Sequence, residues 1–248
     1  MSPPQGAANT THAERASRRS KALAALLLLV PTPSIGAALA MSIDATQGTW
    51  VGQGAYTLSK LWIAALPLVW LLWVDRGRAS WSPPRKGGIG VGLALGVAIS
   101  AGIYAVYQVS GPQMINPVQV KARALQVGIG EPAIFLLFAA YLILVNSLIE
   151  EYVWRWFVFR KCEAALPAGR PAAAVLLSAL FFTLHHVIAL RAQFDWLPTI
   201  LASLGVFVGG VMWSWCYLKY QSIWPGYVSH VVVDLTLLWI GWQLIIGS

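Results

Sequence analysis

The chain has 248 residues, of which 58% are apolar and only 10% are charged. Soluble domains usually contain about 25% charged residues, so this composition excludes a cytosolic globular protein. The net charge of +8 comes from basic residues in short clusters between long apolar runs, as in the loops that flank membrane spans. We therefore expect an all-α fold, a polytopic bundle of about seven to eight transmembrane helices. It would lie in a lipid bilayer and bind no nucleic acid.

Cys162 and Cys216 are the only cysteines, which excludes a disulfide framework and a zinc-finger pattern. The basic N-terminus is followed by an apolar run without a small-residue cleavage site. We expect this run to be a retained first helix and not a signal peptide.

Apolar runs long enough to cross a bilayer recur along the chain. The expected spans are 22–43, 54–74, the first two-thirds of 87–120, a run that starts after Pro132, 171–190, about 197–218 and about 223–246. Pro31 and Pro33 are expected kink points in the first span. Lys60, placed near the start of the second, is expected to snorkel.

Two features refine the helices further. Gly111–Pro112 and Asn116–Pro117 are expected to interrupt the chain after the third span. The pairs Gly92/Gly96 and Gly205/Gly209 have the spacing that lets two membrane helices approach closely, and both are interpreted as packing sites.

The distribution of basic residues predicts the orientation. If the N-terminus is cytoplasmic, most of the 17 lysines and arginines fall on that side. The residues left on the opposite side are Lys60, Lys121, Arg123 and Arg191. Loops rich in Lys and Arg stay inside, so a cytoplasmic N-terminus is predicted.

Ionisable residues inside the spans are the informative ones, because each costs roughly 2.5–3.5 kcal/mol at the centre of a membrane helix. They form three clusters, Glu150-Glu151-x-x-x-Arg155, Phe182-x-x-His185-His186 and His230-x-x-x-Asp234. Such residues usually face the interior of the bundle and have a function.

Helical geometry suggests different roles for the two acids. Neighbouring residues point 100° apart on an α-helix, so Glu150 and Glu151 are not expected to aim at one point. Glu151 and Arg155 are four apart with the acid first, which favours an ion pair near the cytoplasmic edge. This leaves Glu150 unpaired within its own helix, as the acid available for chemistry.

The same geometry is applied to the histidines. His185 and His186 should diverge by 100°, whereas Phe182 and His186 share a face. His230 and Asp234 also share a face and can reach one site. His186 and His230 lie at different distances from the starts of their predicted helices. Their convergence on one site therefore depends on how these helices tilt and pack.

These motifs, in this order on three predicted membrane helices, resemble the CPBP family of CAAX-protease and bacteriocin-processing intramembrane endopeptidases, also called Abi. The family patterns EExxxR, FxxxH and HxxxN or HxxxD are met by Glu150–Arg155, Phe182–His186 and His230–Asp234. The preceding Ser-Ala-Leu-Phe segment favours His186, although Phe181-x-x-x-His185 also fits. The resemblance covers about 145–240.

The resemblance implies a division of the chain: a basic cytoplasmic tail at 1–21, N-terminal transmembrane helices at 22–131, and a CPBP-like catalytic core at 132–248. It also implies hydrolysis of a peptide bond within the membrane. The candidate catalytic residues are Glu150, His186, His230 and Asp234. The supporting residues are Glu151, Arg155, Phe182 and His185.

Two accounts of the chemistry follow from the resemblance, and both fit these residues. Glu150 could activate water directly, with His186 orienting the water and His230 and Asp234 supporting the oxyanion. Alternatively, His186 and His230 could hold Zn²⁺ with a carboxylate. An anionic Asp234 is a poor partner for an oxyanion, because both groups are negatively charged. A role in orienting His230 or in binding a metal is more plausible for it.

The expected partner is a membrane-associated protein or peptide: a prenylated CAAX tail, a bacteriocin leader or a C-terminal sorting helix. Two other classes stay open, a non-catalytic membrane immunity protein and a proton-coupled transporter. The inverted repeats and paired broken helices of many transporters are not seen. HExxH, GxSG and GxGD motifs of other membrane proteases are not seen either.

Overall fold

The computed structural model describes residues 12–247, a part of the chain that contains helices and no strand. Seven helical segments are long and apolar enough to cross a membrane. They are Ala13–Met41, Trp50–Val74, Ile89–Met114, Pro132–Ala165, Pro171–Arg191, Trp196–Tyr220 and Trp224–Ile245. The chain is a multi-pass membrane protein, and the expected all-helical bundle is confirmed.

The first span is broken at the predicted place. Helix α1 (His12–Leu29) ends just before Val30, and α2 (Pro31–Met41) begins at the first of the two prolines. Proline lacks the N–H that would continue the hydrogen-bond ladder, so the chain restarts there. Of the predicted basic tail, residues 1–11 lie outside the described residues, and the rest is already helical.

The next two spans are followed by a short amphipathic helix. Helix α3 (Trp50–Val69) runs into a π-helical turn, η1 (Trp70–Val74), and α4 (Ile89–Met114) is followed by α5 (Pro117–Gln126). The break expected at Gly111–Pro112 is wrong, because α4 continues through Pro112 and ends only at Met114. A proline so close to the end of a helix removes little of the ladder. Asn116 does separate the helices and caps α5 by accepting from two backbone N–H groups.

The fourth span is a rod of several joined helical segments. It comprises α6 (Pro132–Ala140), η2 (Tyr141–Asn146), α7 (Ser147–Glu150), η3 (Glu151–Phe159) and α8 (Arg160–Ala165), where η marks π-helical geometry. Its 34 residues exceed the roughly 20 that cross a hydrocarbon core. Glu150, Glu151 and Arg155 of this rod are buried in the bundle.

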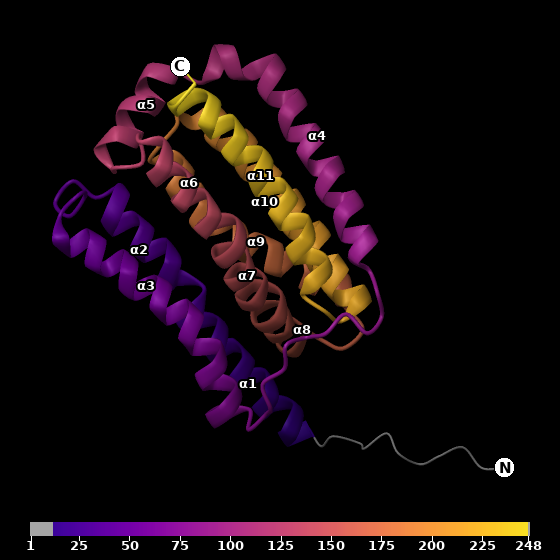
Figure 1. Ribbon diagram of the computed structural model, residues 1–248. Coiled ribbons are helices and arrows are strands. Elements are labelled where there is room, and N and C mark those ends of the chain that lie inside the picture. The colour runs from indigo at the N-terminus through magenta and orange to yellow at the C-terminus, as the bar shows by residue number, and fades with distance from the viewer. Residues whose placement is uncertain (1–11, 248) are drawn as a thin grey trace.

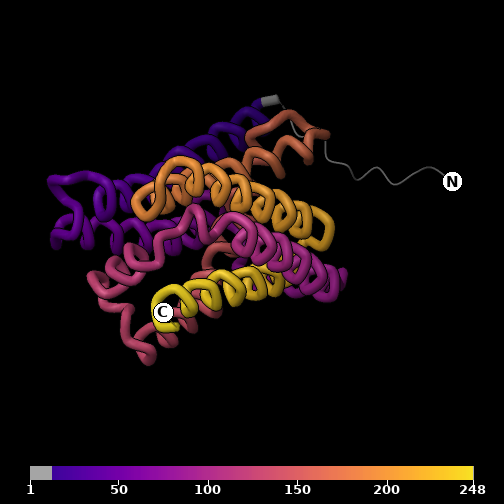
Figure 2. The backbone as a smooth tube through the Cα atoms, turned by 90° about the horizontal axis from the view of Figure 1, so that it is seen from above, coloured from indigo at the N-terminus to yellow at the C-terminus, as the bar shows by residue number. Residues whose placement is uncertain are grey.

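The last three helices are α9 (Pro171–Arg191), α10 (Trp196–Tyr220) and α11 (Trp224–Ile245), close to the predicted bounds. Helix α9 packs along α10, α11 along α4, and α2 along α3. Figure 1 shows α2 and α3 on one flank of the bundle, α4 on the other, and the central rod between them. Viewed from above, Figure 2 likewise separates the indigo N-terminal helices from the yellow C-terminal one.

Close packing of α4 on α11 depends on the first glycine pair. A Cβ atom at Gly92 would overlap the Pro225 carbonyl, and one at Gly96 would lie 2.9 Å from the Ser229 carbonyl oxygen. The interpretation of this pair as a packing site is confirmed. For the second pair it is wrong: nothing lies within 4 Å of a Cβ atom at Gly205, and the three atoms nearest a Cβ at Gly209 belong to Trp213 of its own helix.

The most deeply buried part of the bundle surrounds η3. Val153, Trp154, Val158 and Phe159 of this segment are at most 1% exposed. They belong to a cluster with residues of α1, α9 and α10. A tightly packed segment of this kind holds the adjacent Glu150 and Glu151 in fixed positions.

Candidate active site

The two acids of the first motif lie where the rod changes geometry. Glu150 ends the short α7, and Glu151 begins η3, a π-helical stretch of nine residues. π-helical segments are rare and often occur at functional sites. The wider turn alters the angular spacing that an α-helix would impose on the two carboxylates.

Glu151 pairs with Arg155, as predicted, and the pair is buried. The carboxylate Oε1 lies 3.2 Å from Arg155 Nη1, and the two side chains are 0% and 1% exposed. The guanidinium lies over the rings of Phe182 and Trp213, with centroid distances of 4.4 and 5.0 Å. Aromatic rings of α9 and α10 therefore enclose the pair, and its position near the cytoplasmic edge stays a prediction.

His230 of α11 lies between both acids. Its Nδ1 is 3.1 Å from Glu151 Oε1, and its Nε2 is 3.7 Å from Glu150 Oε2. The expectation that Glu150 and Glu151 cannot address one group is wrong, since they approach opposite nitrogens of one ring. Trp213 fixes the plane of that ring by stacking on it at 4.1 Å.

Asp234 lies one turn after His230 and is held by the central rod. Ser147 donates a 2.6 Å hydrogen bond to Asp234 Oδ2, which lies 3.8 Å from His230 Nε2. The predicted common face of the two residues is confirmed. The shorter contact that orients the ring comes from Glu151 and not from Asp234.

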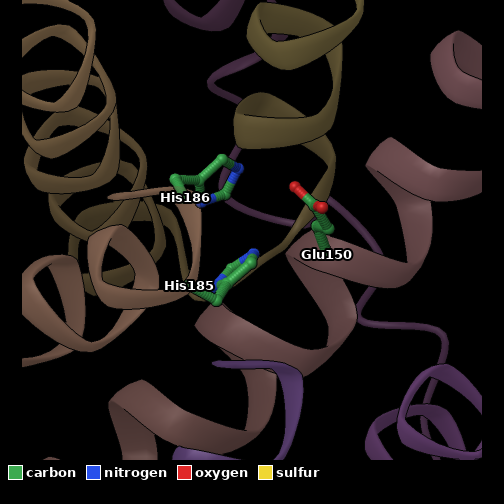
Figure 3. A group of neighbouring side chains, drawn as sticks. All are labelled: Glu150, His185 and His186. Atoms are coloured by element: carbon green, nitrogen blue, oxygen red, sulfur yellow. The ribbon is translucent and has the colours of Figure 1, made fainter. Parts of the chain in front are cut away.

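His185 and His186 both lie beside Glu150. One carboxylate oxygen of Glu150 and one ring nitrogen of each histidine lie within 4.8 Å of one another. Figure 3 shows the Glu150 carboxylate directed toward the two imidazoles. The expectation that His185 points away from the site is wrong. The 100° spacing describes Cα–Cβ directions, and long side chains can still converge on a group that lies between them.

Each imidazole is held differently by its surroundings. His186 Nδ1 lies 2.9 Å from the Phe182 carbonyl oxygen, which can only accept. Nδ1 therefore carries the proton, and in the neutral ring Nε2 keeps its lone pair. His185 instead stacks on Trp154 at 5.3 Å, and its buried Nδ1 has no partner among the described residues.

The structure thus brings Glu150, His186 and His230 to one place, each from a different helix, with Glu151, Arg155 and Phe182 packed behind them. A comparison with family models matches residues 132–236 to the Rce1-like family, described as type II CAAX prenyl endopeptidase Rce1-like. This segment is an Rce1-like protease domain. No curated protein and no solved structure matches the chain significantly.

The Rce1-like domain begins at Pro132 and includes all three motifs. Its family is one of CAAX-type intramembrane endopeptidases, and the buried Glu and His cluster is consistent with the active site of such a protease. The family likewise implies a protein or peptide substrate.

Two polar residues near Glu150 were missed as site residues by the sequence reasoning. Asn146, one turn before Glu150, donates from Nδ2 to Glu150 Oε1 at 3.0 Å. Lys60 of α3 donates to Asn146 Oδ1 at 3.4 Å. The spacing of four between Asn146 and Glu150 was an available signal. Lys60 was interpreted as snorkelling from a helix start, but α3 begins ten residues earlier, about 15 Å along its axis.

A small cavity lies against these residues. Its volume is about 30 Å³, and Lys60, Asn146, Glu150 and Trp154 are among the residues that line it. A cavity needs roughly 10–15 Å³ to hold one water molecule and must supply polar partners. This cavity meets both conditions, so it has room for a water molecule beside Glu150.

The donor set fits a zinc ion, which the family resemblance leaves open. One carboxylate and two imidazoles with a vacant position make up a common catalytic zinc site. The hydrogen bond from His186 Nδ1 to a backbone carbonyl is the outer contact that metal-binding histidines usually make. Glu150, His185 and His186 would hold the ion. The pair predicted for this role was His186 and His230.

Proposed function

We propose that this protein is an intramembrane endopeptidase that hydrolyses a peptide bond of a membrane-associated protein or peptide. The observation that carries the proposal is the convergence of Glu150 with His185, His186 and His230, together with a cavity that Glu150 lines and that is large enough for water. Hydrolysis within a membrane needs such a cavity, because lipid excludes water from the surroundings.

Glu150 is proposed as the general base. It takes a proton from water, and the resulting hydroxide attacks the carbonyl carbon of the scissile peptide bond. The lone pair of His186 Nε2 accepts the second hydrogen of that water and so orients it. Glu150 then returns the proton to the leaving amine as the C–N bond breaks.

His230 is proposed to stabilise the oxyanion. In its doubly protonated form it donates from Nδ1 to Glu151 and offers its Nε2–H to the developing negative charge. The carboxylates of Glu150, Glu151 and Asp234 lie within 3.8 Å of the ring and balance its charge. Asp234, held by Ser147, thus acts on His230 and not on the oxyanion.

Zinc, when bound, would supply a Lewis acid that polarises water or the substrate carbonyl. The chain would then contribute Glu150, His185 and His186 as ligands and His230 as an oxyanion partner. The roles of Glu151 and Arg155 behind His230 are the same in both accounts.

The test is cleavage of a panel of membrane-anchored peptides by the purified protein, with products identified by mass spectrometry. The panel contains prenylated C-terminal tails, leader peptides and C-terminal sorting helices, and Glu150→Gln is the matched inactive control. Cleavage by the unmodified protein alone supports the proposal. Equal products, or none from either protein, would overturn it.

The same assay, run with a strong chelator, separates the two chemical accounts. Activity that survives chelation assigns water activation to Glu150 alone. Activity that is lost and returns with zinc assigns Glu150, His185 and His186 as metal ligands, and inductively coupled plasma analysis of the purified protein then measures about one zinc per chain.

A further inference from the structure

Lys60 is a charged residue deep in an apolar span and outside the Rce1-like domain. Within residues 12–247 it forms no ion pair with a carboxylate. Its hydrogen bond to Asn146 Oδ1 joins α3 to the central rod, and its ammonium also lies 5.6 Å from the ring of Tyr56. A lysine in this setting costs roughly 2.5–3.5 kcal/mol, and such residues usually have a function.

The contact with Lys60 determines which way the Asn146 amide faces. An ammonium can only donate, so the amide oxygen must turn toward Lys60 and the amide nitrogen must turn away from it. The nitrogen then faces Glu150 Oε1 at 3.0 Å and donates to it. The ionised carboxylate of Glu150 can only accept, so the two partners of the amide favour the same orientation.

The orientation of the amide in turn determines which oxygen of Glu150 can act as a base. Oε1 already accepts a hydrogen bond from Asn146, so a proton taken from water goes to Oε2. Oε2 is the oxygen that faces His230 Nε2, at 3.7 Å. Lys60, Asn146 and Glu150 also line the same cavity of about 30 Å³.

We propose that Lys60 and Asn146 are positioning residues that hold Glu150 with Oε2 turned toward His230 and left to act as the base. This inference rests on the proposed function of Glu150 as general base. It assigns a role in the protease chemistry to α3, which lies outside the matched family segment. Neither Lys60 nor Asn146 needs to touch the substrate in this role.

The test compares four variants with a matched control. Lys60→Met removes the charge at similar length, and Lys60→Arg keeps a donor. Asn146→Leu removes both hydrogen bonds of the amide. Asn146→Asp keeps an acceptor for Lys60 but has no N–H for Glu150. Gln53→Met, seven residues before Lys60 on the same helix, is exposed and controls for a change of polarity on α3.

We expect kcat to fall about 10- to 100-fold in Lys60→Met, Asn146→Leu and Asn146→Asp, which is the usual loss when an outer contact of a site is removed. KM should stay within about twofold, and Lys60→Arg should restore kcat to within a few-fold. Gln53→Met should match the unmodified protein, and melting temperatures in detergent should be equal across the set. A rise in KM at constant kcat would instead make Lys60 a substrate-binding residue and overturn the inference. Full activity in Asn146→Asp would do the same.

An infrared measurement tests the inference without cleavage. The carboxylate band of Glu150 is identified by its loss in Glu150→Gln. It should shift in Asn146→Leu and Asn146→Asp and stay in place in Gln53→Met. An unshifted band in both Asn146 variants overturns the inference. Retained cleavage in Glu150→Gln overturns the proposed function instead, so the two failures are distinguishable.

Discussion

Glu150 and Glu151 are adjacent in the chain but have different surroundings. Glu151 is fully buried, and its Oε1 is shared between Arg155 and His230. Among the described residues, Glu150 forms no ion pair with a cation of its own rod, and it borders the cavity. A carboxylate that is already engaged by a guanidinium is a weak base, whereas one that faces water can accept a proton from it.

For Glu150→Gln we expect loss of cleavage by a factor of about 10²–10⁴, because an amide cannot take a proton from water. The protein should still insert and accumulate normally, since glutamine keeps the shape of the side chain. The measurement is kcat together with the yield of protein extracted from membranes. Near-normal cleavage would show that Glu150 is not the base.

For Glu151→Gln we expect a loss of stability as well as of activity. The change leaves Arg155 buried without a counter-charge, and breaking a buried pair typically costs about 3–5 kcal/mol. The melting temperature in detergent and the folded yield should both fall below those of Glu150→Gln. Equal stability of the two variants would contradict the structural role of Glu151.

For the histidines, the structure changes the expected pattern of variants. From helical spacing alone His185→Ala would keep most activity, but both rings lie beside Glu150. We now expect His186→Ala to lose about 10²-fold or more, as for a direct partner of the water. His185→Ala should lose about 10- to 100-fold, as for a supporting contact. Full activity in His185→Ala would restore the assignment of the site to His186 alone.

At the level of elements, α4 supports the site from behind α11. Gly92 and Gly96 contact the backbone of α11 at Pro225 and Ser229, next to His230. Ser100 of α4 also donates to the Val232 carbonyl oxygen at 3.1 Å. These contacts lie on a face of α11 next to the one that meets Glu151, and they set the distance between α4 and α11 beside His230.

Gly96→Leu should therefore lower both stability and activity. The added side chain has no space against the α11 backbone, and overpacking typically costs about 1–3 kcal/mol. Gly102→Ala on the same helix is the control, because nothing lies within 4 Å of the added Cβ atom. Melting temperature and kcat in detergent check the prediction, and equal values for the two variants would contradict it.

At the level of the whole molecule, the two ends of the bundle differ in charge. The start of α1, the loop after η1 and α8 lie at one end of the bundle, and α5 lies at the other (Figure 1). The first end includes Arg76, Arg78 and the buried Lys161, which pairs with Asp75 at 2.5 Å. This grouping supports the proposal of a cytoplasmic N-terminus.

Labelling of single cysteines tests this orientation. Cys162 and Cys216 are both buried, so background reaction should be low. With a cytoplasmic N-terminus, an impermeant maleimide should label Gln126→Cys in intact cells and Ala79→Cys only after the membrane is opened. Both positions are exposed. Labelling in the reverse order would mean that the N-terminus lies outside.

Much of the architecture could be predicted from the sequence, because span length and apolar character follow from the composition of each segment. The ion pair of Glu151 with Arg155 and the common face of His230 and Asp234 followed from helical spacing. These properties are local: each depends on residues within one helix and on the solvent around it.

The assembly of the site depended on tertiary structure. Glu150 and Glu151 reach opposite edges of one imidazole. This arrangement follows from the π-helical turn and from the depth at which α11 packs against the rod. His185 joins the cluster because of the rotation and tilt of α9. Lys60 reaches Asn146 because of the rotation and tilt of α3. Sequence spacing describes directions around one helix axis. It holds no information on where neighbouring axes lie, and that relation is decided by packing between helices.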